Sequence, residues 1–187
     1  MTHFIKLIDY IFSPLVLFVV CGALLVIYSI QKNNNFFDIS GIFKEQFSIF
    51  KDCKYQFIVF YLVPALLSIG IIRIKYIDDK IVNNLNIVLS IFVSMFFAML
   101  SIISSFNSNR KDLFDKLLKE TYNSIMFEII LAIFILMLTF TFSFISGVIN
   151  ISVIRGLSFF IYYFTFVMLL NIFIVLKRMK ALFENKS

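Results

Sequence analysis

The chain has 187 residues, of which 61% are hydrophobic and 15% are charged, and its mean hydropathy is +0.97. Soluble globular domains are about 45–50% apolar and about 25% charged, so the composition excludes an ordinary soluble domain. The net charge of +6 is typical of a membrane protein with basic cytoplasmic loops, because anionic lipid headgroups attract Lys and Arg.

Five stretches without a charged residue predict an all-α fold, a polytopic transmembrane helix bundle that forms a single membrane domain over residues 1–187. A helix needs roughly 20 apolar residues to cross a hydrocarbon core about 30 Å thick, and each stretch approaches or exceeds this length. The expected spans are residues 11–30, 55–72, 86–106, 129–149 and 157–176.

The first span is interpreted as a retained helix, because its apolar run from Tyr10 to Ile30 exceeds the roughly 7–15 residues of a signal-peptide core. The second span, 55–72, is the shortest and carries Pro64 near its centre. Proline removes a backbone donor and kinks a helix. If this segment does not cross the membrane, four spans remain.

The distribution of Lys and Arg orients the five spans. Cytoplasmic loops of membrane proteins carry an excess of these residues. The loops 31–54 and 107–128 and the tail after residue 176 hold twelve basic residues, against five on the opposite side. We therefore expect a multi-pass protein whose C-terminus is cytoplasmic.

Residues 108–124, between the third and fourth spans, have the pattern of an amphipathic helix, with apolar residues at 113, 114, 117, 118 and 122. The acid-first i,i+4 pairs Asp112–Lys116 and Asp115–Lys119 favour the helix, which we expect to run directly into the fourth span. Its apolar stripe either lies against headgroups and the bundle or docks a cytoplasmic partner. The docking hypothesis assigns Leu113, Lys116, Leu117, Leu118 and Lys119.

The other long connection, 40–54, places Phe43, Phe47 and Phe50 on one helical face, with Lys44 and Lys51 elsewhere. This pattern predicts a short amphipathic helix that lies in the plane of the membrane.

The residue types needed for catalysis are sparse. The single histidine, His3, is near the N-terminus, and Cys21 and Cys53 lack the spacing of a redox or zinc motif. No phosphate-binding, metalloprotease or serine-hydrolase motif is present. We therefore expect no enzyme, no catalytic residues, no cofactor and no metal site.

A row of small residues follows one side of the third span. Small residues let helix backbones approach closely, so the stripe predicts helix packing or an oligomer interface. The other interpretation is a hydroxyl-lined water path. The stripe consists of Ser90, Ser94, Ala98, Ser101 and Ser105.

Polar side chains in the last two spans are few. Glu128 and Arg155 bracket the fourth span and are expected to be interfacial anchors, which argues against a coupled transporter or proton pump. Interhelical hydrogen bonds are expected from the polar side chains within these spans, which are Asn171 in the fifth and Thr139, Thr141, Ser143 and Ser146 in the fourth. Because basic and acidic residues alternate along the loops, no direct nucleic-acid binding by this chain is expected.

A polytopic chain of this length, rich in Phe, Ile and Asn, with a basic amphipathic segment from Arg110 to Tyr122 and no catalytic motif, resembles the membrane subunit of the Kiwa anti-phage defence system. The resemblance implies a bacterial inner-membrane protein that assembles as a homo-oligomer, a tetramer, in contact with the lipid bilayer. It further implies a membrane sensor or anchor that holds a cytoplasmic, DNA-binding partner subunit. The alternative is a small homo-oligomeric channel or membrane-disrupting effector with the serine stripe along its pore.

Overall fold

The computed structural model describes residues 20, 39–48, 54–105, 112–147 and 150–184, which fall into two compact units, Met1–Phe43 and Lys44–Ser187. In the first unit, the described residues are Val20 and 39–43, all helical. The expected span 11–30 otherwise lies outside the described residues.

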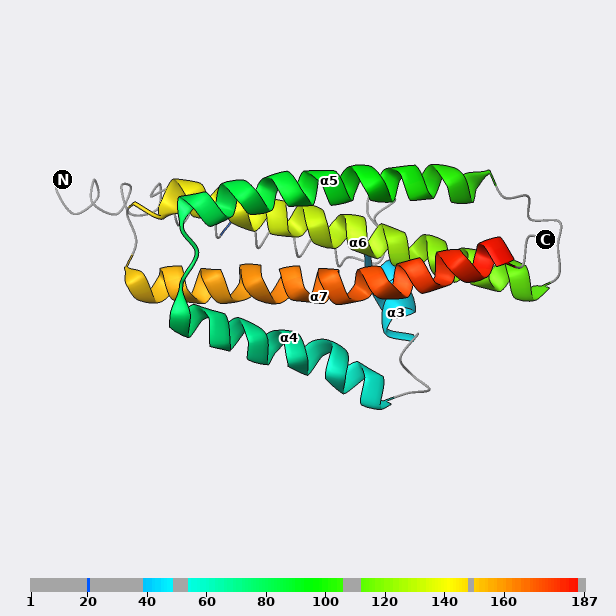
Figure 1. Ribbon diagram of the computed structural model, residues 1–187, viewed down its shortest axis with the longest axis horizontal. Helices are drawn as coiled ribbons and strands as arrows, with labels where there is room; N and C mark the ends of the chain where they lie inside the picture. The colour runs from blue at the N-terminus through cyan, green and yellow to red at the C-terminus, as the bar shows by residue number, and fades with distance from the viewer. Residues whose placement is uncertain (1–19, 21–38, 49–53, 106–111, 148–149, 185–187) are drawn as a thin grey trace, which may run out of the picture. The chain divides into compact units, whose positions relative to one another are not determined.

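The regular elements of the described ranges are all α-helices, as the composition predicted. Four of them are long and apolar enough to cross a membrane, so the chain is an all-α polytopic membrane protein. Short connections make these four helices alternate in direction (Figure 1). The helices are α3 (Ile39–Ser48), α4 (Lys54–Ile74), α5 (Asp79–Ser104), α6 (Asp112–Ile145) and α7 (Ile151–Glu184).

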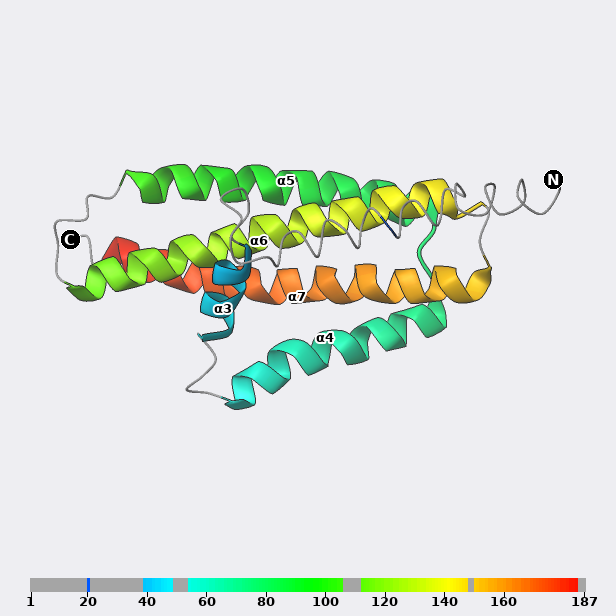
Figure 2. The same cartoon turned by 180° about the vertical axis from the view of Figure 1, so that it is seen from behind.

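The four long helices pack side by side in the order α5, α6, α7, α4, with α6 in contact with both α5 and α7, and α7 in contact with α4 (Figures 1 and 2). On α5 the buried residues recur every seven positions, at Val82, Leu89, Phe96 and Ile103. A seven-residue repeat keeps one seam facing a neighbouring helix that crosses at a small angle. The seven-residue spacing of the buried residues therefore explains why α5 stays in contact with α6 along its length.

The helix α4 continues through Pro64. Pro64 and Ser68 are both buried, and the Ser68 hydroxyl donates to the Pro64 carbonyl at 2.7 Å. A hydroxyl that bonds to the carbonyl four residues earlier satisfies itself within the helix and needs no water. The expected weak span 55–72 is thus one continuous helix, of which Phe57–Ile74 is apolar enough to cross the bilayer.

The helices α6 and α7 have 34 residues each. At 1.5 Å per residue each is about 50 Å long, whereas the hydrocarbon core is about 30 Å thick. The described part of the amphipathic segment, residues 112–124, does run directly into the fourth span, because α6 is continuous from Asp112. When the connected ends Ile145 and Ile151 lie at one membrane surface and the helices run along the membrane normal, about 20 residues of each cross the core. Residues 112–125 of α6 and 171–184 of α7 then project beyond the other surface. We call this pair of projecting segments the stem.

The helix α5 begins at a capped turn on the membrane side opposite the stem. The Asp78 carboxylate accepts from the Ile81 amide at 2.8 Å and pairs with the Lys75 ammonium at 2.8 Å. The hydrogen bond from Lys75, followed by that from the Ile81 amide, lowers the pKa of Asp78 below its ordinary value of 3.8. Such a carboxylate stabilises the first helical turn most strongly when it is ionised.

Acidification is expected to loosen the first turn of α5. Because the folded-state pKa of Asp78 is lowered, its stabilisation is complete above the ordinary pKa and is lost as the pH falls through the lowered pKa. Hydrogen exchange of residues 79–82, corrected for the intrinsic rate, measures the loss. Asp78→Asn keeps a capping oxygen that does not titrate, so the same loss in this variant would contradict the assignment.

Candidate functional site

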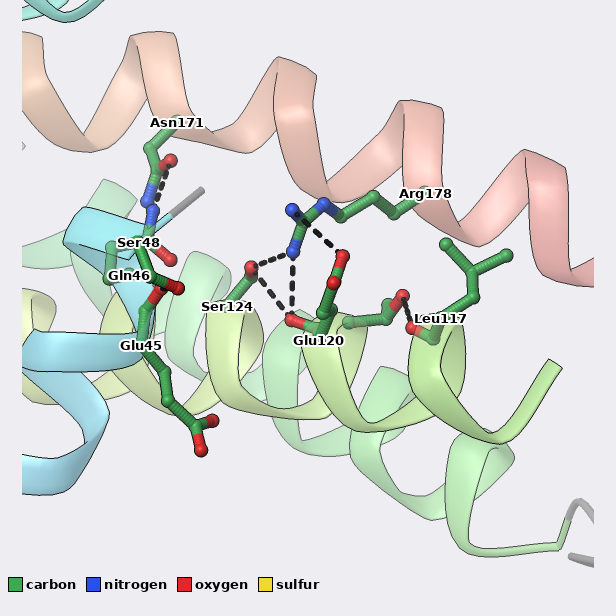
Figure 3. Close-up of polar contacts among 9 residues, drawn as sticks. Glu45, Gln46, Ser48, Leu117, Glu120, Ser124, Asn171 and Arg178 are labelled. Atoms are coloured by element: carbon green, nitrogen blue, oxygen red, sulfur yellow. Dashed lines mark hydrogen bonds and ion pairs between the residues drawn. The ribbon is translucent and has the colours of Figure 1, made fainter. Parts of the chain in front are cut away.

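An arginine clamp joins the two helices of the stem (Figure 3). Arg178 of α7 donates through Nη1 to the Glu120 carbonyl at 2.9 Å and to the Ser124 hydroxyl at 2.7 Å. Its Nη2 lies 3.4 Å from Glu120 Oε2, and the Arg178 side chain is only 12% exposed. Charge-assisted hydrogen bonds of this kind are stronger than neutral ones and fix the rotation of α7 relative to α6.

An apolar cluster continues through the stem beside this clamp. Phe114 of α6, Met179 and Leu182 of α7, and Ile103 of α5 are buried in it. In water, burial of apolar side chains stabilises helix packing at roughly 25 cal/mol per Å², a contribution that is missing between helices surrounded by lipid. The cluster thus ties α5, α6 and α7 together at the stem end of the bundle.

The residues expected to dock a partner differ in their exposure in the structure. Leu117 and Leu118 are partly buried and pack against the apolar cluster, so this side of the helix serves the interior of the chain itself. Lys116 and Lys119 are exposed, and Lys119 lies 3.4 Å from the Glu45 carboxylate. Leu113 belongs to α6, but its side chain is outside the described part of the chain.

A hollow bordered by polar and charged residues lies between α3 and the stem portion of α6. The charges in it are mixed, since two lysines stand beside two glutamates. Mixed charge favours a protein or peptide surface over a simple anion or cation. The lining residues are Glu45, Ser48, Lys116, Lys119, Glu120 and Asn123.

Three consecutive side chains of α3 contact three different helices. Glu45 pairs with Lys119 of α6. Gln46 Nε2 donates to Asn171 Oδ1 of α7 at 2.9 Å (Figure 3). The ring of Phe47 lies 5.8 Å, between centroids, from that of Tyr61 on α4. The expected amphipathic helix in 40–54 therefore exists, and its last turn packs on α4, α6 and α7.

Glu128 is fully buried, contrary to the expectation of an interfacial anchor. Its Oε1 accepts a hydrogen bond from Asn171 Nδ2, so Gln46, Asn171 and Glu128 form one buried polar chain across α3, α7 and α6. Sequence reasoning missed this because Glu128 stands at the border of a charge-free run. A signal was present, since Thr121, Ser124 and Glu128 share one helical face at intervals of three and four residues.

The small-residue stripe of α5 faces away from the packed side of that helix. All five residues, Ser90, Ser94, Ala98, Ser101 and Ser105, are exposed. The Ser90 hydroxyl donates to the Asn86 carbonyl at 2.8 Å, and that of Ser94 to the Ser90 carbonyl at 2.9 Å. The stripe therefore does not line the interior of the described bundle.

Two hydrogen bonds tie the opposite end of the bundle together. Thr139 of α6 donates to Asn86 Oδ1 of α5 at 2.6 Å, which confirms the interhelical bond expected for Thr139. The same expectation is wrong for Thr141 and Ser143, whose hydroxyls donate to carbonyls of α6 itself, because a hydroxyl can bond to the carbonyl four residues earlier. The Ile77 amide, in the connection between α4 and α5, donates to the Ser158 hydroxyl of α7 at 3.1 Å. Arg155, expected as an anchor, is exposed near the start of α7.

The stem, the hollow and the buried polar chain are the three features with chemical character in the described residues. Within these residues, no group of three or more His, Cys, Asp and Glu side chains could hold a metal ion. In comparisons with known proteins, no family model, no curated protein and no solved structure matches this chain.

Proposed function

We propose that the chain is the membrane subunit of an anti-phage defence complex of the Kiwa kind, and that its stem holds a cytoplasmic partner subunit at the inner membrane. The observation that carries the docking part is the length of α6 and α7, which project together beyond a bilayer. The defence role follows from the resemblance of the sequence. Among the described residues, seven Lys and Arg lie toward the stem end and four toward the opposite end, an excess that supports a cytoplasmic stem by the positive-inside rule. The seven are Lys44, Lys54, Lys116, Lys119, Lys177, Arg178 and Lys180, and the four are Arg73, Lys75, Lys80 and Arg155.

The outer surface of the stem suits a protein partner. Tyr122 of α6 is 41% exposed and Phe183 of α7 is 47% exposed. Lys116 and Lys180 lie exposed on the same two helices. Exposed aromatic residues bordered by charge are typical of protein interfaces, because the aromatic side chains fill pockets and the charges steer association. The partner is accordingly expected to present an apolar, acidic surface.

Reversing the charge of Lys116 and Lys180 together is expected to reduce co-purification of the partner at least about tenfold. Two like-charge contacts with an acidic surface cost several kcal/mol of binding free energy. A loss of about 1.4 kcal/mol already lowers the affinity tenfold. The measurement is a pull-down from cells that express the native operon, extracted in mild detergent and quantified by mass spectrometry. Both side chains are exposed, so the bundle itself is expected to remain folded.

The matched control reverses Lys80 and Arg155, two exposed basic residues on the opposite side of the membrane. This variant makes the same charge change and is expected to retain the partner. If both double variants retain the partner equally, the stem is not the docking surface. If no partner co-purifies even with the wild-type chain, the anchoring role itself is contradicted.

The mass of the intact complex in the same preparation, measured by native mass spectrometry, tests its oligomeric state. The exposed stripe from Ser90 to Ser105 is the face of α5 that a second copy would cover, and the resemblance implies a tetramer. In a channel, by contrast, this stripe would surround the symmetry axis. A homo-oligomer that lacks a partner and makes vesicles leak ions would favour the channel over the anchor.

A further inference from the structure

The buried polar chain leaves one atom without a partner at each end. Gln46 donates to Asn171, and Asn171 donates to Glu128 Oε1, while Gln46 Oε1 and Glu128 Oε2 are buried and accept no hydrogen bond. The three residues are at most 2% exposed. The Asn171 amide joins the Gln46 amide to the Glu128 carboxyl, and all three groups are planar. The two oxygens without a donor, Gln46 Oε1 and Glu128 Oε2, therefore lie at the two ends of one short chain of hydrogen bonds.

Among the described residues, no ion pair joins Glu128 to a cation. On the facing helices, Lys119 is paired to Glu45, Arg178 to Glu120 and Lys180 to Glu184. The remaining described cations of α3 and of the stem, Lys44, Lys116 and Lys177, are exposed, whereas Glu128 is fully buried. The other titratable groups nearby are the phenols Tyr61 of α4 and Tyr163 of α7, which carry no positive charge. A buried carboxylate without a counter-ion is costly, so such a group binds a proton or a cation.

A single proton completes the hydrogen bonding of this cluster. Protonation of Glu128 Oε2 creates one donor, and within this chain of three residues the acceptor still lacking a donor is Gln46 Oε1. With the bond Oε2–H to Gln46 Oε1, each of the three groups donates once and accepts once, in a closed ring. An ionised Glu128 offers no donor and leaves both oxygens unsatisfied.

We propose that Glu128 is a proton-binding site, and that the bound proton closes a ring of three hydrogen bonds which fastens α3 to α6 and α7. The site lies 17 residues before Ile145, about 26 Å along α6, and is therefore near the stem-side edge of the hydrocarbon core. A proton from the water on that side reaches this depth without crossing the membrane. Loss of the proton opens the ring at Gln46 and loosens the last turn of α3, whatever function the stem has.

Infrared difference spectroscopy of the protein in lipid vesicles tests the proton directly. The carbonyl stretch of a protonated carboxylic acid is separated from the carboxylate bands, and a Glu128→Gln minus wild-type spectrum isolates the band of Glu128. The band is expected at neutral pH and is expected to survive in Glu184→Gln, a control at an exposed glutamate. In Gln46→Leu the band is expected to move to higher frequency, because the acid loses its acceptor.

Hydrogen exchange of α3 tests the consequence. In the wild type, protection of residues 44–48, corrected for intrinsic rates, is expected to fall as the pH rises. Glu128→Gln keeps a donor at the same position, so its protection should be independent of pH. Gln46→Leu should exchange about tenfold faster at every pH.

Three results would overturn the proposal. The first is a wild-type spectrum in which Glu128 contributes only carboxylate bands. The second is loss of α3 protection in Glu128→Gln equal to that in Gln46→Leu. The third is protection of α3 that requires Na⁺ or K⁺ in the buffer, which would make the cluster a cation site.

Discussion

Replacing Leu182 by alanine is expected to lower the free energy of unfolding by about 3–5 kcal/mol, and Leu89→Ala by only about 1–2 kcal/mol. Both leucines are fully buried. Leu89 is ten residues into α5, about 15 Å along it, in the middle of the bilayer, whereas Leu182 is in the stem. In water the truncation loses both hydrophobic transfer and packing, but in lipid it loses packing alone.

Steric trapping in lipid bicelles measures the two free energies in the presence of a bilayer. The pair is matched, because residue type, substitution and burial are the same and only the surrounding medium differs. Equal costs for the two variants would mean that Leu182 and Leu89 lie in the same medium. The projection of the stem into water would then be wrong.

Substitution of Arg178 by methionine is expected to cost about 2–3 kcal/mol. Methionine keeps most of the aliphatic part of the arginine side chain, but it loses two charge-assisted hydrogen bonds and the pairing with Glu120. Glu120 is partly exposed and can turn to water, which keeps the cost below that of a fully buried ion pair. The same unfolding measurement reports the change.

Two companion variants separate charge from geometry at this position. Arg178→Lys retains the charge but not the forked donor, so it is expected to recover less than half of the loss. Lys180→Ala removes a cation from an exposed pair with Glu184 and is expected to cost less than about 0.5 kcal/mol. A cost at Arg178 no greater than that at Lys180 would contradict the clamp.

The helices could be predicted from the sequence because lipid imposes a simple rule. Any long run without charge must satisfy its backbone internally, so it forms a helix. This rule found α4 in spite of Pro64, and the pattern of residues 108–124 correctly predicted that the helix continues into the next span. The projection of α7 was not predicted, because the charged residues after 176 were assigned to a tail.

The buried polar chain could not be predicted from the sequence. Gln46 and Asn171 are 125 residues apart, and Asn171 and Glu128 are 43 apart, so nothing local pairs them. Glu128 at the edge of an apolar run has the same appearance whether it anchors the helix in headgroups or turns inward. The difference depends on the rotation of α6, which the packing of α5 and α7 determines.

The amphipathic pattern of residues 108–124 was equally ambiguous. An apolar stripe on a helix has the same period whether it packs within the chain or binds a partner. In the structure Leu117 and Leu118 pack against the apolar cluster of the stem, while Lys116 stays exposed. Only the exposed part of the expected docking surface remains available for a partner.

Cysteine labelling tests most directly whether the stem projects into the cytoplasm. In a chain with Cys21 and Cys53 replaced by serine, single cysteines at Tyr122, Lys180 and Arg155 are treated with a membrane-impermeant maleimide. Tyr122→Cys and Lys180→Cys are expected to react in inverted vesicles only, and Arg155→Cys in intact cells only. A chain in which the first two stay unlabelled in both preparations, like a control cysteine at Phe134, would contradict the projecting stem.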